Sequence, residues 1–228
     1  IYPYEIRDSK RELIQEKMIT INSQTELKIS PRKIKSREFI HHIMNRENSI
    51  ILDIESVLKL DERESYFTDE INDDYPKICI IGTILNHNDV FKDFTIKYLD
   101  EEEEKKIIQY WLSYLKKSLK TDKIKVYHWA PAERIYVDYM MKKYPDLEYP
   151  QFEFIDLLKY FKEEPITIQG CFGYGLKEIV KMLYSHQLIN NQWQDDTDGL
   201  EAMIRIMKTS EEASQNKITI KGNTEIKK

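Results

Sequence analysis

Apolar residues gather in three short runs in the first half of the chain, and each run predicts a β-strand. The first is 49–56, the second is Lys77–Leu85, and the third is the alternating run 89–97. The turn-forming residues 86–88 separate the second run from the third, so these two runs should form a hairpin beside the first. We therefore expect an antiparallel meander of three strands.

The rest of the pattern predicts helices that alternate with strands. Residues 100–120 carry apolar positions at helical spacing, with an acidic first turn and a lysine-rich end that suit the helix dipole. A strand at Lys123–His128, a helix at 131–143, a strand at 152–155 and helices near 175–186 and 199–208 follow. Antiparallel strands followed by this alternation predict an α/β fold, a mixed sheet with helices on its faces.

Shifts in composition divide the chain into three parts. Residues 1–47 are expected to be an upstream arm, with short helices near 11–17 and 36–45 and a basic segment between them. Residues 48–208 form the expected catalytic-size domain, and 209–228 form a polar, lysine-rich tail. The acidic loop 61–74 is longer than a hairpin needs, which is typical of functional or mobile loops.

Composition excludes several classes of protein. The chain has 228 residues, of which 41% are hydrophobic, an ordinary value for a globular domain. No apolar run reaches membrane-spanning length and the N-terminus lacks the apolar core of a signal peptide, so we expect no membrane partner. Cys79 and Cys171 are the only cysteines, which favours reduced thiols in an intracellular compartment over a disulfide scaffold or a zinc site.

Net charge changes this picture only slightly. A formal charge of −5 argues against nonspecific coating of nucleic acid, but local patches govern phosphate contact. One such patch is the segment from Lys28 to Arg37, in which Arg32, Lys33 and Lys35 lie close together. This segment either follows a phosphate backbone or is a solvated linker, and the sequence supports both interpretations equally.

Two carboxylates at the end of the first predicted strand are the main candidate for chemistry. Successive side chains of a strand point to opposite faces, so Asp53 and Glu55 should share one face while Leu52 and Ile54 fill the other. Mg²⁺ and Mn²⁺ prefer such oxygen ligands, and a pair of ions can stabilise the attacking and leaving oxygens of a phosphodiester. The alternative is a strand end whose acids are merely solvated.

Four segments together resemble the four-carboxylate (DEDD) 3′–5′ exonuclease superfamily. They are Asp53-Ile54-Glu55, then 126–133, 154–158 and 174–179. The order and spacing are most similar to the ribonuclease-H-like domain that accompanies predicted RecB-type nucleases, including hypothetical proteins of large DNA viruses. The resemblance covers roughly Asn48 to Lys208. It implies a ribonuclease-H-like fold, two Mg²⁺ or Mn²⁺ ions, a DNA or RNA substrate and further domains in the same protein.

The resemblance also implies roles for individual residues outside the first strand. Glu133 occupies the position of the second acid, and Asp138 is a fallback that is better interpreted as solvated. Asp156 is expected to line the catalytic cleft, where it could be a metal ligand; the alternative is that it caps a helix. The resemblance further suggests contacts with nucleic acid for a Tyr-His-Trp segment and a Gly-Leu-Lys element, which contain His128, Trp129 and Lys177. Trp129 either stacks on a base or closes the core.

The last acid of the superfamily pattern is missing from its expected place. Either the acidic segment 195–201 supplies it, or the polypeptide stops before the helix that carries it, and the polar end of the chain favours the second. On that interpretation the 228-residue chain should be weak or inactive as a nuclease. Two alternatives stay open: a catalytically inactive domain that binds nucleic acid or organises a larger protein, and an endonuclease or transposase-like enzyme.

Overall fold

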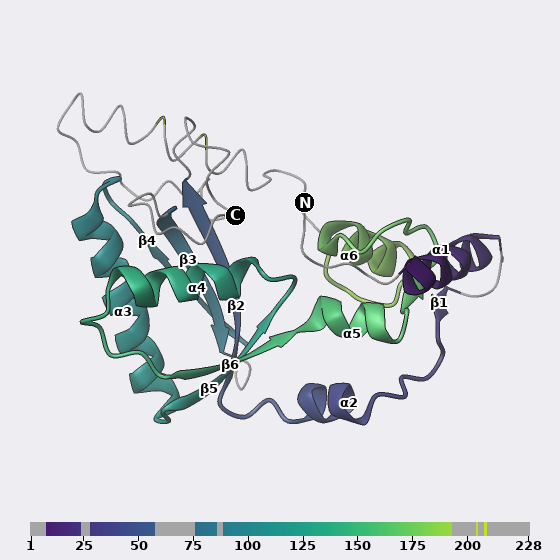
Figure 1. Ribbon diagram of the computed structural model, residues 1–228, viewed down its shortest axis with the longest axis horizontal. Helices are drawn as coiled ribbons and strands as arrows, with labels where there is room; N and C mark the ends of the chain where they lie inside the picture. The colour runs from purple at the N-terminus through teal and green to yellow at the C-terminus, as the bar shows by residue number, and fades with distance from the viewer. Residues whose placement is uncertain are drawn as a thin grey trace. The chain divides into compact units, whose positions relative to one another are not determined.

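The computed structural model describes residues 8–23, 28–57, 76–85 and 89–192, together with positions 204 and 208 (Figure 1). Contacts divide these residues into two units. Residues 47–155 form what we call the sheet unit, and residues 8–46 with 156–192 form the helical unit.

Five strands build the sheet, in the order β4-β3-β2-β5-β6. Their bounds are β2 Ser49–Val57, β3 Lys77–Leu85, β4 Val90–Thr95, β5 Lys123–His128 and β6 Gln151–Asp156. β2, β3 and β4 pair antiparallel, whereas β5 runs parallel to β2. This mixed sheet is consistent with a ribonuclease-H-like arrangement, which confirms the predicted fold class.

Two helices flank the sheet, α3 Glu101–Leu119 and α4 Ala132–Lys143 (Figure 1). α3 begins where Asp100 accepts a hydrogen bond from the backbone N–H of Glu103, which satisfies one of the free donors of the first turn. The buried Trp111 of α3 donates from Nε1 to Oγ1 of Thr83, at 2.9 Å. Thr83 pairs with Leu52 of β2, so α3 covers the face of the sheet that contains Leu52.

A buried carboxylate ties α3 to both the sheet and α4. Glu104, which is 1% exposed, accepts the backbone N–H of Ile78 at 2.9 Å. Its other oxygen accepts from Lys143 Nζ at 2.7 Å and from the Tyr144 hydroxyl at 2.9 Å, at the end of α4. Both helices therefore lie on the same side of the sheet.

Three short helices, one longer helix and a two-stranded ribbon form the helical unit. Its elements are α1 Asp8–Asn22, β1 Ile29–Ser30, α2 Arg37–Met44, α5 Leu157–Glu163, β7 Thr167–Ile168 and α6 Leu176–Ser185. β1 pairs antiparallel with β7, and α1 and α6 both contact β7 (Figure 1). The Asn22 side chain at the end of α1 donates to Cys171 O and accepts from Gly170 N, so α1 is fastened to the segment before α6.

Most expected elements are present, but the chain is grouped differently from the expectation. Contacts divide the chain after Arg46, and residues 156–192 group with residues 8–46 and not with the sheet. The strands β1 and β7 were not predicted, and α5 was expected only through the alternative that Asp156 caps a helix. The loop 61–74, the tail 209–228 and nearly all of the predicted helix 199–208 lie outside the described residues.

Candidate active site

Asp53 and Glu55 project from the same face of the central strand, as expected. Leu52 and Ile54, on the opposite face, are 3% and 5% exposed, whereas Asp53 is exposed and Glu55 is half-buried. The register continues this alternation into β3, where Asp53 pairs with Gly82. Because α3 covers the Leu52 face, the two carboxylates lie on the side of the sheet away from α3.

The neighbourhood of Asp53 includes Gly82 and Asp93, two residues that sequence reasoning missed. Gly82 pairs with Asp53 on one side and with Asp93 of β4 on the other, so the two aspartates flank a residue without a side chain. A Cβ on Gly82 would lie 3.4 Å from Cε2 of Phe91, so this ring leans over the glycine. The Asp93 carboxylate accepts a hydrogen bond from the Thr95 hydroxyl at 3.1 Å.

The local structure shifts the pKa of the Asp53 carboxyl group and changes the geometry at the end of its strand. Burial among neighbouring atoms raises the pKa of Asp53 although part of the side chain is exposed, and a backbone hydrogen bond from Ile54 opposes this shift. A β-bulge follows at once, because Glu55 pairs with Ile80 and Ser56 pairs with Ile78. Bulges of this kind redirect side chains and are frequent beside active sites.

The turn from β5 to α4 brings His128 and Glu133 together. His128 is buried, and its Nδ1 contacts the carbonyl oxygen of Ala130, which requires a proton on Nδ1. Ala130 has φ +70°, the left-handed region that alanine rarely adopts. Glu133 Oε2 lies 3.8 Å from the same nitrogen, and the His128 ring packs edge-on against Phe154. The turn is therefore built around this histidine.

Asp156 caps a helix. Its Oδ1 accepts hydrogen bonds from the backbone N–H groups of Leu158 at 2.9 Å and Lys159 at 3.3 Å, so it begins α5. This is one of the two alternatives that the sequence left open, and it does not exclude a second role for the carboxylate.

The other predicted site residues lie in varied surroundings. Trp129 is half-buried after β5, Lys177 is half-buried in the first turn of α6, and Asp138 is exposed on α4. The side chains of Arg32, Lys33 and Lys35 are exposed. The backbone of their segment is held in place, because the N–H groups of Lys35 and Ser36 donate to the Glu164 carboxylate.

Metal ligation can be judged only for the described ranges. Within them, no three side chains of His, Cys, Asp or Glu gather closely enough to hold a metal ion. Asp53 and Glu55 therefore stand as a pair, and Glu133 does not join them in such a group. The acidic segment 195–201 lies outside the described residues.

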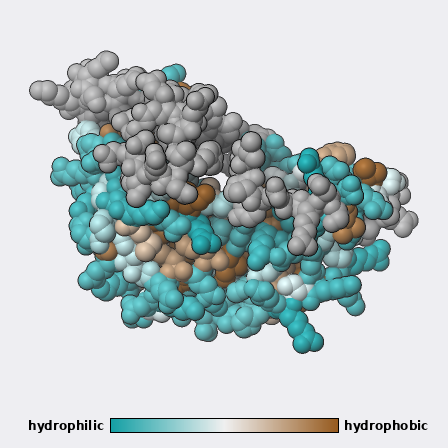
Figure 2. Space-filling view, in the orientation of Figure 1, coloured by the Kyte–Doolittle hydropathy of each residue, from teal (hydrophilic) through white to brown (hydrophobic). Residues whose placement is uncertain are grey.

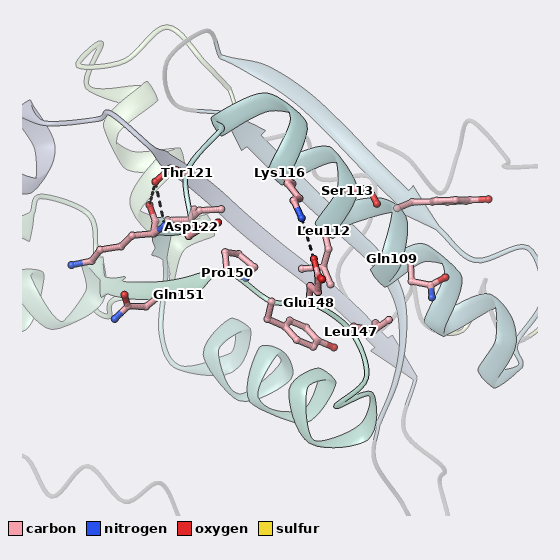
Figure 3. Close-up of a pocket in the computed structure, with 14 residues that line it drawn as sticks. Gln109, Leu112, Ser113, Lys116, Thr121, Asp122, Leu147, Glu148, Pro150 and Gln151 are labelled. Carbon is pink, nitrogen blue, oxygen red and sulfur yellow. Dashed lines mark hydrogen bonds and ion pairs between the residues drawn. The ribbon is translucent and has the colours of Figure 1, made fainter.

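A pocket of about 930 Å³ lies elsewhere in the sheet unit, between α3 and the segment that leads into β6 (Figure 3). Gln109, Ser113 and Lys116 line it from α3, and Lys116 forms an ion pair with Glu148 at 3.0 Å. The pocket also borders Lys123, where β5 starts, whereas His128 is at the other end of that strand. Open α/β sheets bind ligands at the carboxyl ends of their strands, so this pocket is a poor candidate for the reaction site.

Comparisons with protein-family models, curated proteins and solved structures find no match. No helix in the described part of the chain is both long and apolar enough to cross a membrane. A functional assignment therefore has to rest on the geometry of the chain itself.

Proposed function

We propose that this chain is a metal-dependent nuclease domain that hydrolyses phosphodiester bonds of DNA or RNA, in the 3′–5′ direction. The observation that carries the proposal is the pair Asp53 and Glu55, which share the face away from α3 on the central strand of a ribonuclease-H-like sheet. The bulge that follows Glu55 gives this strand end the irregular geometry that is common beside active sites.

The donor set fits a hard divalent cation. Two carboxylates two residues apart on one strand offer the anionic oxygens that Mg²⁺ and Mn²⁺ prefer. Asp53 and Glu55 would hold the ions, and within the described residues no third acid joins them. When bound, two such ions would supply Lewis-acid activation of water and stabilisation of the leaving oxygen.

Other residues of the chain have roles within this proposal. Burial of part of the Asp53 side chain raises its pKa, and a bound cation would favour the charged carboxylate and so oppose this shift. The contacts of His128 with Ala130 and Glu133 fix the turn that begins α4, and the neighbouring Trp129 would contact a base. Such a protein would act on intracellular nucleic acid as one domain of a larger protein.

Hydrolysis of a labelled strand tests this function. The full chain is incubated with single-stranded DNA or RNA that carries a 5′ label, with Mg²⁺ or Mn²⁺, and a 3′–5′ enzyme should produce a ladder of shortened labelled products. Asp53→Asn and Glu55→Gln should abolish the ladder. Asp89→Asn changes an exposed acid of the same unit, in a left-handed conformation that asparagine tolerates, and should preserve it.

One observation favours a second function, a catalytically inactive domain that binds nucleic acid or organises a larger protein. No group of three possible metal ligands occurs in the described ranges, whereas two-metal hydrolysis needs more than two acids. Thermal denaturation with and without Mn²⁺ separates the two functions. A nuclease should gain melting temperature from Mn²⁺ and lose this gain in Asp53→Asn. An inactive domain should show neither the gain nor a ladder.

A further inference from the structure

A glycine-rich loop in the helical unit presents one aromatic ring to solvent. In the loop from Gly170 to Gly175, Cys171 is buried and Tyr174 is half-buried, but Phe172 is 75% exposed. A ring that is exposed to this extent is accessible for stacking on a flat ligand. Figure 2 shows hydrophobic residues at the surface near α1 and α6, within the same unit.

Hydrogen bonds fix the backbone that carries the Phe172 ring. The N–H of Phe172 donates to Glu178 Oε1 at 2.7 Å, and the N–H of Cys171 donates to Ile168 O at 3.0 Å. Gly170 N donates to the Asn22 side chain at 2.6 Å. Because the loop is tied to α1, β7 and α6, binding through the ring would need little further ordering of the backbone.

Space is left around the ring. Residues 173 and 175 are glycines and carry no side chain, although a Cβ on Gly173 would lie 3.3 Å from Glu178 Oε2. A Cβ placed on Gly175 would meet no heavy atom within 4 Å, which marks open room at the start of α6. A flat ligand could therefore approach the ring.

Two lysines follow the loop along α6, on the same helix as Glu178, whose carboxylate accepts the Phe172 N–H. Ile179 marks the buried side of this helix, while Lys177, Lys181 and Tyr184 follow at spacings of four and three residues on another side. We call Phe172, Lys177, Lys181 and Tyr184 the aromatic–basic stripe. From Lys177 to Tyr184 it extends about 10 Å along the helix, the rise of about three stacked nucleotides.

The basic segment of the arm starts beside the far end of α6. Lys28 Nζ donates to His186 O at 3.1 Å, and Gln169 N donates to Lys28 O at 3.0 Å. The described residues of the helical unit contain 13 Lys and Arg against 8 Asp and Glu. A polyanion is therefore the partner that matches the charge of this unit.

We infer that the aromatic–basic stripe is a binding surface for single-stranded nucleic acid, with Phe172 stacking on a base and the two lysines contacting phosphates. An aromatic platform next to cations is how proteins hold single strands without reading their sequence, because every base has a face that stacks. Bases of a duplex are already stacked on one another, so the ring selects single strands. The stripe does not include Asp53 or Glu55, and binding to it does not require hydrolysis.

Fluorescence anisotropy of labelled oligo(dT) with the full chain tests the inference, in EDTA so that no hydrolysis occurs. Phe172→Ala should weaken binding about tenfold, within the range of about 1–3 kcal/mol measured for a base–aromatic stack, and Phe172→Trp should retain it. Tyr110→Ala removes an aromatic residue of α3 that is 56% exposed, and it should have no effect. Circular dichroism verifies that each variant is folded.

The salt dependence separates the lysines from the ring. Lys177→Ala and Lys181→Ala should each reduce the slope of log K against log salt by about 0.7, whereas Lys117→Ala on α3 should leave it unchanged. The inference is overturned if oligo(dT) does not bind at low salt, if Phe172→Ala binds as tightly as the native chain, or if a duplex competes equally well. Binding to anionic vesicles through Phe172 without binding to oligo(dT) would also overturn it.

The same series distinguishes this inference from the proposed nuclease activity. Asp53→Asn should lose hydrolysis and keep oligo(dT) binding, because Asp53 is not part of the stripe. If hydrolysis is absent but binding depends on Phe172, the proposed function fails and the binding surface stands. If hydrolysis depends on Asp53 but oligo(dT) binding ignores Phe172, the reverse holds.

Discussion

Replacing Glu104 by glutamine should destabilise the sheet unit severely. The carboxylate accepts hydrogen bonds from three donors, on β3, on Lys143 and on Tyr144, and its side chain is almost completely buried. Glutamine keeps the shape but replaces one acceptor oxygen with an NH₂ group. This group would face a donor, and the Lys143 ammonium would lose its closest counter-charge.

The size of the effect follows from this geometry. Removing one partner of a buried ion pair costs about 3–5 kcal/mol, because the other charge stays buried. Lys143 is 16% exposed and lies 3.8 Å from the carboxylate of Glu101, so part of its charge remains compensated. We therefore expect a loss near the lower end, about 3 kcal/mol in the free energy of unfolding.

Urea denaturation followed by tryptophan fluorescence measures this loss, because the buried Trp111 belongs to α3. With a slope of about 2 kcal/mol per molar urea, the midpoint should fall by about 1.5 M. Glu102→Gln, at an exposed position in the same helical turn, should change stability by less than about 0.5 kcal/mol. If Glu104→Gln behaves like this control, the buried network does not hold the two helices and the sheet together.

Three further predictions follow from other contacts. Asp156→Ala removes the N-cap of α5 and should lower the free energy of unfolding by about 0.5–2 kcal/mol, which thermal denaturation measures. Asp156→Asn should restore the cap, and it should abolish hydrolysis only if the carboxylate is also a metal ligand. Gly170→Ala should destabilise the helical unit and speed amide hydrogen exchange there, because φ is +92° and the new Cβ would lie 2.4 Å from Met182 Sδ. Gly175→Ser, in open space, should be tolerated. Asp53→Asn should raise the free energy of unfolding at neutral pH in EDTA, because the folded state raises the pKa of this carboxyl group and so disfavours its charge. The gain should vanish as the pH falls below 3.8, the ordinary pKa of the group, and a constant gain at all pH values would contradict this reasoning.

Local sequence signals were sufficient for most of the fold. The acidic first turn after Asp100 and the apolar spacing behind it predicted α3, and β3 and β5 have the expected bounds. The sequence offered α5 only as an alternative role for Asp156, because this residue ends β6 and caps α5 with no residue between them. The two-residue strands β1 and β7 are too short to show any periodicity.

The site was predictable only where it depends on a single strand. The alternation along β2 was sufficient to place Asp53 and Glu55 on one face. Asp93, by contrast, reaches that face through the register of two other strands across Gly82, which no local pattern encodes. The contact between Glu133 and His128 likewise depends on the left-handed conformation of Ala130, which the sequence gives no reason to expect.

The net charge of the whole chain is a poor guide to its partners, because the two units differ in sign. The described residues of the sheet unit carry 16 Asp and Glu against 13 Lys and Arg, whereas basic residues predominate in the helical unit. Phosphates respond to charges within about one Debye length, roughly 8 Å at physiological salt, and not to a sum over the chain. The net charge of −5 for the whole chain therefore does not argue against binding of nucleic acid to the helical unit. Acidic residues that bind cations and basic residues that bind phosphates can belong to different units. The net charge of the chain then indicates neither kind of site.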